Sequence, residues 1–330
     1  MVRPLPPVDW PVRFDEVPDR WSPSQDALCP CGSRRRVRSC HGSRSGEWHI
    51  PIPQPLLRDA RTGYSHSGCY ARSTCDCSTK LSQEHWVSLE VLNSASADGR
   101  SLLVSGHPWL HGEEKWLPTK ALGSNVLCTR HNNALSDLDA TAGKLFRVLD
   151  GFQTALADPS SPARHGSSLI GVFTGPDLER WLLKVLWGGI SAGAFGFEGE
   201  SITSLRSDID HESLLETLFR GQAWPKGWGL YMGFVPGARL QEDARLSYTS
   251  ATGPDGSAWQ VTVSIGVVDF RVTLGTPDGV GPNLVRQPGG VVLEQQGGTG
   301  HLLLALAWPD VGHHIVRYSR LPDDAAVTAN

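Results

Sequence analysis

All seven cysteines of this 330-residue chain lie between Cys29 and Cys128, and none follows. A secreted chain held together by disulfides usually spreads an even number of cysteines along its length. Clustered cysteines with histidines beside them instead predict bound metal. We therefore expect residues 25–135 to fold around two separate zinc sites.

The first cluster lies in the segment CPCGSRRRVRSCHG and offers Cys29, Cys31, Cys40 and His41 as four ligands. Four soft ligands this close in sequence can close a tetrahedral zinc shell, and so short a segment needs the metal in order to fold. The spacing closely resembles the SEC-C motif, a small zinc hook found in many bacterial proteins. That resemblance implies structural zinc and a docking surface rather than catalysis.

The second cluster combines two distant pieces of chain. Cys128 and His131 form a C-x-x-H pair at the start of an amphipathic helical pattern, and an upstream cysteine pair would complete four ligands. Three cysteines, Cys69, Cys75 and Cys77, compete for those two positions. The pattern predicts a treble clef, in which a zinc knuckle is followed by a second ligand pair at a helix start.

The residues around this cluster resemble the HNH endonucleases. Glu84-His85 stands at the first signature position, and Asn132 directly follows the second zinc pair, whose His131 replaces the usual cysteine. Asp139 matches a branch of the family that has aspartate at the third position. The resemblance implies a structural zinc together with an open catalytic Mg²⁺ or Mn²⁺ site.

A closer similarity links residues 68–92 and 125–146 to a group of uncharacterised bacterial proteins. That group shares the patterns Cys-Tyr … Asp-Cys-Ser … Ser-x-Glu-His and Leu-Cys-x-x-His-Asn-x-Ala-Leu-Ser-x-Leu-Asp. It favours Cys69 and Cys77 as the upstream zinc ligands, because Cys77 lies in the Asp-Cys-Ser context. A Cys75/Cys77 pair is the alternative.

Phosphodiester hydrolysis is the chemistry that these residue types would serve. A neutral His85 can take a proton from an attacking water, and Asp139 is a hard oxygen ligand suited to Mg²⁺ or Mn²⁺. Asn132 would orient the His85 loop or the metal shell, and Glu84 would hold the hairpin or join that shell. The primary hypothesis is therefore a metal-dependent HNH-type endonuclease that hydrolyses DNA.

Two other hypotheses remain open. Many HNH proteins have a proline a few residues after the base histidine, whereas Trp86 and Val87 follow here. A catalytically inactive zinc module that binds nucleic acid or a protein is therefore the main alternative. An adaptor that docks through the zinc hook is the third.

The overall class expected is α+β, with the zinc hook and treble clef followed by a mixed C-terminal domain. Helical patterns mark Asn133–Leu156, Pro176–Ile190 and the short stretch Ser213–Phe219, and the second of these is interrupted at Gly188-Gly189, where we expect the helix to end. β-Strand patterns mark Trp259–Leu274, Gly290–Glu294, His301–Trp308 and His314–Tyr318. The expected divisions are a Pro-rich lead (1–24), the hook (25–50), the HNH-like module (51–157), a linker (158–168) and an α+β domain of unknown role (169–330).

Charge and hydropathy limit the environment and partners. The net charge of −4 is too small to indicate nucleic-acid binding by itself, so the expectation of a DNA partner rests on the site. No apolar run approaches the roughly 20 residues of a membrane helix, and the start lacks a signal-peptide pattern. We expect a cytoplasmic protein without a membrane partner, and a protein partner could bind the hook or the C-terminal domain.

Overall fold

The structure is a computed structural model that describes residues 13–14, 24–29, 31, 34–41, 53–157, 168–197, 199–233, 246–266, 268–275, 284–295, 301–309 and 315–320. Most of the expected Pro-rich lead and all but the last residue of the expected linker lie outside these ranges. Helices and sheets are mixed along the chain, which confirms the predicted α+β class. No described helix is both long and apolar enough to cross a membrane.

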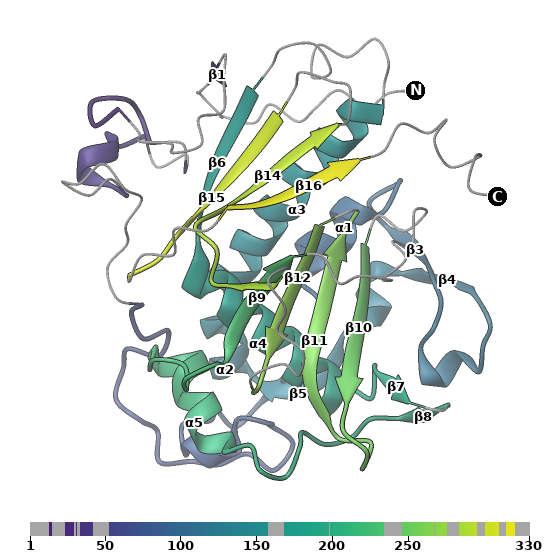
Figure 1. The fold of residues 1–330 in the computed structure, drawn as a ribbon. Helices are drawn as coiled ribbons and strands as arrows, with labels where there is room; N and C mark the ends of the chain where they lie inside the picture. Colours follow the sequence, from purple (N-terminus) through teal and green to yellow (C-terminus); the bar gives the residue numbers. More distant parts are fainter. Residues whose placement is uncertain are drawn as a thin grey trace.

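Two five-stranded sheets dominate the fold, and Figure 1 shows them one above the other. The first has the order β1-β6-β15-β14-β16, with bounds Arg13–Phe14, Ser168–Thr174, His301–Ala307, Gly290–Gln295 and Ile315–Arg320. The second has the order β10-β11-β12-β9-β13, with bounds Leu246–Thr252, Ala258–Ile265, Val268–Thr273, Gly229–Gly233 and Leu284–Arg286.

The strand pattern predicted over Trp259–Leu274 is therefore two antiparallel strands rather than one run. Val261 of β11 pairs with Val272 of β12, and the chain reverses at Gly266. Gly266 has a φ of +57°, a left-handed conformation that glycine adopts without steric cost. The three later strand predictions correspond to β14, β15 and β16.

Three two-stranded ribbons complete the β structure. They pair β2 (Leu81–Glu84) with β5 (Ser124–Cys128), β3 (Ser101–Val104) with β4 (Lys115–Pro118), and β7 (Gly196–Phe197) with β8 (Glu200–Ser201). The β3–β4 ribbon fills much of the long interval between His85 and Cys128, and Figure 1 shows it extending from one side of the molecule.

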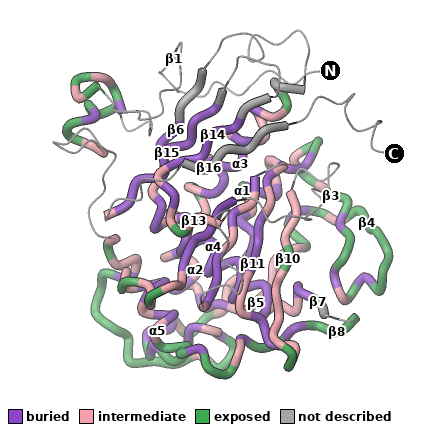
Figure 2. Tube along the Cα trace, in the orientation of Figure 1, coloured by how far each residue is buried: buried purple, intermediate pink, exposed green. Residues whose placement is uncertain are grey.

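The helical pattern expected from Asn133 to Leu156 appears as two helices, α2 (Thr129–Ala134) and α3 (Ser136–Ala157). The apolar face of α3 is buried, as the spacing of three and four predicts. Its buried residues are Leu138, Ala142, Leu145, Phe146, Leu149 and Phe152. Figure 2 shows the interior lying where the helices meet the sheets.

Helix α4 (Gly175–Ser191) confirms the prediction at Pro176–Ile190, but it does not stop at Gly188-Gly189. A Cβ on Gly188 would lie 2.9 Å from the Trp86 side chain, and one on Gly189 would lie 2.3 Å from the Phe195 ring. The two glycines therefore let aromatic rings approach the helix backbone. Gly188 and Gly189 thus permit close packing of Trp86 and Phe195, and they do not end the helix.

The remaining helical elements are short. They are α1 (Leu89–Ala95), α5 (His211–Leu215), the π-type turn η6 (Glu216–Arg220) and the 3₁₀ turns η1 (Val37–Ser39), η2 (Arg72–Thr74), η3 (Pro108–Leu110) and η4 (Thr119–Leu122). The short helix expected over Ser213–Phe219 corresponds to α5 and η6 together, and Asp210 caps it by accepting a hydrogen bond from Glu212 N. One large cluster of buried residues runs from Leu57 to Trp308, so α3, α4 and both five-stranded sheets contribute to one core.

A buried carboxylate, Asp76, holds the irregular segment before β2 against the rest of the fold. Its side chain has no solvent exposure and forms ion pairs with Arg130 (2.9 Å) on α2 and Arg220 (2.6 Å) at the end of η6. It also accepts a hydrogen bond from Thr62 N at 3.0 Å. One carboxylate thus joins three segments that are distant in sequence.

Replacing Asp76 with alanine should lower the free energy of unfolding by about 3 kcal/mol, because two partly buried guanidinium groups lose their shared counter-ion. Chemical denaturation of zinc-loaded protein measures the change. Asp59→Ala is the matched control, since Asp59 pairs with Arg130 at 3.8 Å from a side chain that is 90% exposed. Equal midpoints for the two variants would contradict the role given to Asp76.

Candidate metal centres

The hook cluster is assembled by a tight turn. Cys29 N donates to Arg35 O at 2.7 Å, Val37 N donates to Ala27 O at 2.9 Å, and η1 leads directly to Cys40. Those bonds bring Cys29, Cys31, Cys40 and His41 together, with all four ligand atoms within 4.8 Å of one another. Ligand atoms in a tetrahedral zinc site lie about 3.4–3.8 Å apart. The predicted set therefore fits one zinc ion.

Contacts with the body of the protein hold this hook in place. Lys144 on α3 donates to Cys31 O at 2.5 Å, and its ammonium lies 5.7 Å from the centre of the Phe173 ring. Burial lowers the pKa of Lys144. Cys31 also packs against Val172 and Ala305, so the hook is attached to α3 and to the first sheet.

The second cluster brings together Cys69, Cys77, Cys128 and His131, all four buried and within 4.8 Å of one another. Cys128 ends β5, and His131 lies on α2. Four buried ligands with no open position are typical of a structural zinc site rather than a catalytic one. Cys75 is exposed, with a φ of +51° at the end of η2, and it does not belong to the set.

A hydrogen bond outside the ligand set fixes the tautomer of His131. The Thr74 hydroxyl has one proton, which it donates to Ala71 O at 2.8 Å. It therefore accepts from His131 Nε2 at 3.1 Å. The proton is then on Nε2, and the lone pair on Nδ1 faces the Cys128 sulfur at 3.1 Å and the Cys69 sulfur at 3.7 Å. That orientation suits metal ligation through Nδ1.

The residues expected to catalyse hydrolysis lie beside this second cluster. Asn132 donates to Ser82 Oγ at 2.8 Å and to Gln83 O at 3.2 Å, and so holds strand β2. Glu84 ends that strand and has a buried side chain. Asp139 lies in the first turn of α3.

A cation that the sequence analysis did not include lies between the two carboxylates. Lys184 of α4 has no solvent exposure and forms ion pairs with Glu84 (2.7 Å) and with Asp139. Ser88 also donates to Asp139, and Trp181 Nε1 donates to Ser88 Oγ at 2.8 Å. We refer to Glu84, Asp139 and Lys184 as the carboxylate–lysine cluster.

The charges in this cluster, together with burial, shift the pKa values of Lys184 and Glu84. Burial lowers the pKa of Lys184, but the Glu84 and Asp139 carboxylates outweigh burial and raise it above its usual value, so the amine stays protonated. Burial raises the pKa of Glu84 to about 7, although Lys184 opposes the shift. One ammonium thus faces two carboxylates, and it does not fully offset the cost of burying the Glu84 charge.

His85 follows β2 and is half-buried. Burial, together with the nearby Lys184 charge, lowers its pKa and favours the neutral imidazole that a general base requires. Its Nε2 atom is buried and has no hydrogen-bond partner among the described residues. The imidazole has the right protonation state for a base, but this nitrogen is closed to solvent.

The sequence analysis did not identify Lys184, Thr74, Ser88 or Trp181, each of which contacts the site through a residue distant in the sequence. Lys184 interrupts the apolar pattern of WLLKVLW, and a lone charge in such a run signals either exposure or a buried counter-ion. Thr74, Ser88 and Trp181 carry no pattern of their own. No family model, curated protein or solved structure matches the chain.

The geometry predicts the zinc content of single-cysteine variants. The wild-type protein should hold two zinc ions, whereas Cys40→Ser and Cys77→Ser should each lose one, because three ligands hold zinc more weakly than four. Mass spectrometry of the metal content after dialysis measures this. Cys75→Ser is the matched control and should keep both ions. Loss of zinc from Cys75→Ser with retention in Cys77→Ser would contradict the ligand assignment.

Proposed function

We propose that this chain is a zinc-stabilised binding protein whose HNH-like module is not a nuclease. The observation that carries the proposal is the Lys184 ammonium between Glu84 and Asp139. Those two carboxylates are the oxygen ligands that a catalytic Mg²⁺ or Mn²⁺ would use. An ammonium in contact with both carboxylates competes with a divalent ion for the same oxygens.

The cost of displacing this ammonium is large. Removing one partner of a buried ion pair costs about 3–5 kcal/mol, since the other charge is left unpaired in a low-dielectric interior. A divalent cation would have to overcome that cost before it gained affinity for the carboxylates. This cost would lower the binding constant for the divalent cation by roughly a hundredfold to several-thousandfold.

The β3–β4 ribbon favours a protein as the binding partner. Leu103 and Trp116 are directly opposite each other across the ribbon and are 51% and 66% exposed. Trp109, in the connection between the strands, is 45% exposed. Exposed apolar side chains gathered on one element are typical of protein contacts. Glu113 and Glu114 in the same connection would repel a phosphate backbone.

A metal-dependent nuclease acting on DNA is the second candidate. The neutral His85, next to Glu84 and close enough to Asp139 for that charge to affect its pKa, is the observation that favours it. For this candidate, Lys184 would have to leave the two carboxylates and His85 Nε2 would have to become accessible to water.

Plasmid cleavage distinguishes the two candidates. Zinc-loaded wild-type protein with Mg²⁺ or Mn²⁺ should leave supercoiled and single-stranded DNA uncut, because Lys184 holds the carboxylates that the metal needs. Gel analysis should give the same result for His85→Ala of equal zinc content. Cleavage by the wild-type protein that is lost in His85→Ala would overturn the proposal in favour of the nuclease.

Removing the lysine should create the missing cation site. Lys184→Ala leaves the buried Glu84 and the partly buried Asp139 without their counter-ion. Mn²⁺ should therefore raise the melting temperature of the zinc-loaded variant and leave that of the zinc-loaded wild type unchanged. Scanning calorimetry measures the shift, and Mn²⁺ electron paramagnetic resonance measures the bound ion.

The double variant Glu84→Gln/Lys184→Met is the matched control. It lacks both the Lys184 ammonium and the Glu84 carboxylate, and it keeps only the Asp139 carboxylate. We therefore expect it to fold and to show no Mn²⁺ response. An equal Mn²⁺ response in the wild type and in Lys184→Ala would mean that Lys184 does not exclude the metal.

A further inference from the structure

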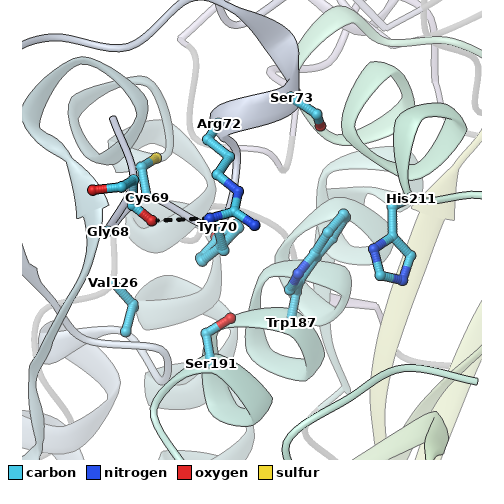
Figure 3. Close-up of a pocket in the computed structure, with 10 residues that line it drawn as sticks. Gly68, Cys69, Tyr70, Arg72, Ser73, Val126, Trp187, Ser191 and His211 are labelled. Atoms are coloured by element: carbon cyan, nitrogen blue, oxygen red, sulfur yellow. Dashed lines mark hydrogen bonds between the residues drawn. The ribbon is translucent and has the colours of Figure 1, made fainter. Parts of the chain in front are cut away.

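A hollow of about 400 Å³ opens beside the second zinc cluster, on a part of the molecule that the proposed function does not use. Four separate segments form its wall: η2 with the loop before it, strand β5, the C-terminal half of α4 and the start of α5. Figure 3 shows Arg72, Trp187 and Ser191 around this hollow, with His211 beyond Trp187. Its volume lies within the range of small-molecule sites.

The polar side chains of the wall can all donate hydrogen bonds, and the serine hydroxyls and the imidazole can also accept them. The lining residues with such side chains are Ser67, Arg72, Ser73, Trp187, Ser191 and His211. No aspartate or glutamate is among the lining residues. A wall of donors without a carboxylate suits a ligand that is rich in acceptors and negatively charged.

Arg72 differs from the other arginines of this region. Arg61 pairs with Glu216, whereas Arg130 and Arg220 both pair with Asp76. Arg72 makes no ion pair with any described carboxylate, and one of its nitrogens donates to Ser67 O at 3.3 Å. That bond steadies the side chain and leaves further N–H groups of the guanidinium for a ligand.

The remaining wall is aromatic and apolar. Tyr70 and Trp187 stack with ring centroids 5.5 Å apart and an interplanar angle of 18°. Val126 of β5 also lines the hollow. A bare phosphate would leave most of this space unfilled. A ligand with a flat ring attached to its anionic group would use both the donors and the apolar wall.

We infer that this hollow binds a small organic anion, a phosphate or carboxylate carried on a planar ring, with Arg72 as its principal partner. The inference does not depend on whether the HNH-like module is catalytic. Cys69, a ligand of the second zinc cluster, also lines the hollow, so the site requires that zinc knuckle to be folded.

Isothermal titration calorimetry of the zinc-loaded full chain tests the site with four probes. Adenosine 5′-monophosphate and benzoate carry the two anion types on a ring, adenosine lacks the charge, and inorganic phosphate lacks the ring. At least one ring-bearing anion should bind saturably, and adenosine and inorganic phosphate should each bind at least tenfold more weakly than that anion. The stronger of the two anions identifies the source of the charge.

Arg72→Met should weaken that binding by about tenfold to a hundredfold, since a charge-assisted hydrogen bond contributes about 1.5–3 kcal/mol. Arg58→Met is the matched control, because Arg58 is exposed, does not line the hollow and should bind the probe as the wild type does. His211→Asn gives a second lining variant and should also weaken binding. Two results would overturn the inference: neither ring-bearing anion binding at about 10 mM, or Arg72→Met binding as tightly as Arg58→Met.

Discussion

Helix α4 is buried along most of its length although it carries Glu179, Arg180 and Lys184. A charge in such a place needs partners within the fold, since water cannot solvate it. Glu179 accepts from Leu230 N at 2.8 Å, and Arg180 donates to Leu218 O at 2.9 Å. Lys184 pairs with the carboxylates beside the second zinc cluster. Each charged side chain thus fixes a different neighbour, and together they set how the zinc-bearing segments sit against the sheets.

Zinc bound at the two cysteine/histidine clusters would stabilise the N-terminal segments, as the burial of apolar side chains stabilises the rest of the fold. Residues 53–80, all of them described, contain one short 3₁₀ turn and no α-helix or strand, so no regular ladder of backbone hydrogen bonds holds them. A structural zinc ion can contribute on the order of 10 kcal/mol to folding, which is comparable to the stability of a whole domain. Asp76 and Thr74 then connect this segment to α2, through the Arg130 guanidinium and the His131 ring.

The sequence predicted the features that depend on local spacing. The first ligand set, the apolar face of α3 and the helix at Pro176–Ile190 follow from the order of residues alone, whereas the choice of Cys69 and Cys77 over Cys75 came from the resemblance to the bacterial group. It did not predict that Gly188 and Gly189 continue α4, because their role is to admit rings from distant segments. Nor did it find Lys184, whose partners Glu84 and Asp139 lie 100 and 45 positions earlier in the chain. A side chain with distant partners leaves only a weak local signal, here one lysine in an apolar run.

The weak local signal of Lys184 explains why the HNH resemblance and the Lys184 geometry point to different functions. Motif spacing identifies the residues that surround a site, but it does not identify the cation that occupies it. One ammonium between two carboxylates supplies a single positive charge, and the pKa of Glu84 rises to about 7 because burial penalises its charge more than Lys184 compensates. A divalent ion would balance both carboxylates without a proton. Lys184 therefore offsets only part of the charge of the two carboxylates, and this residue, which sets the electrostatics of the cluster, lies outside the motif that first indicates it.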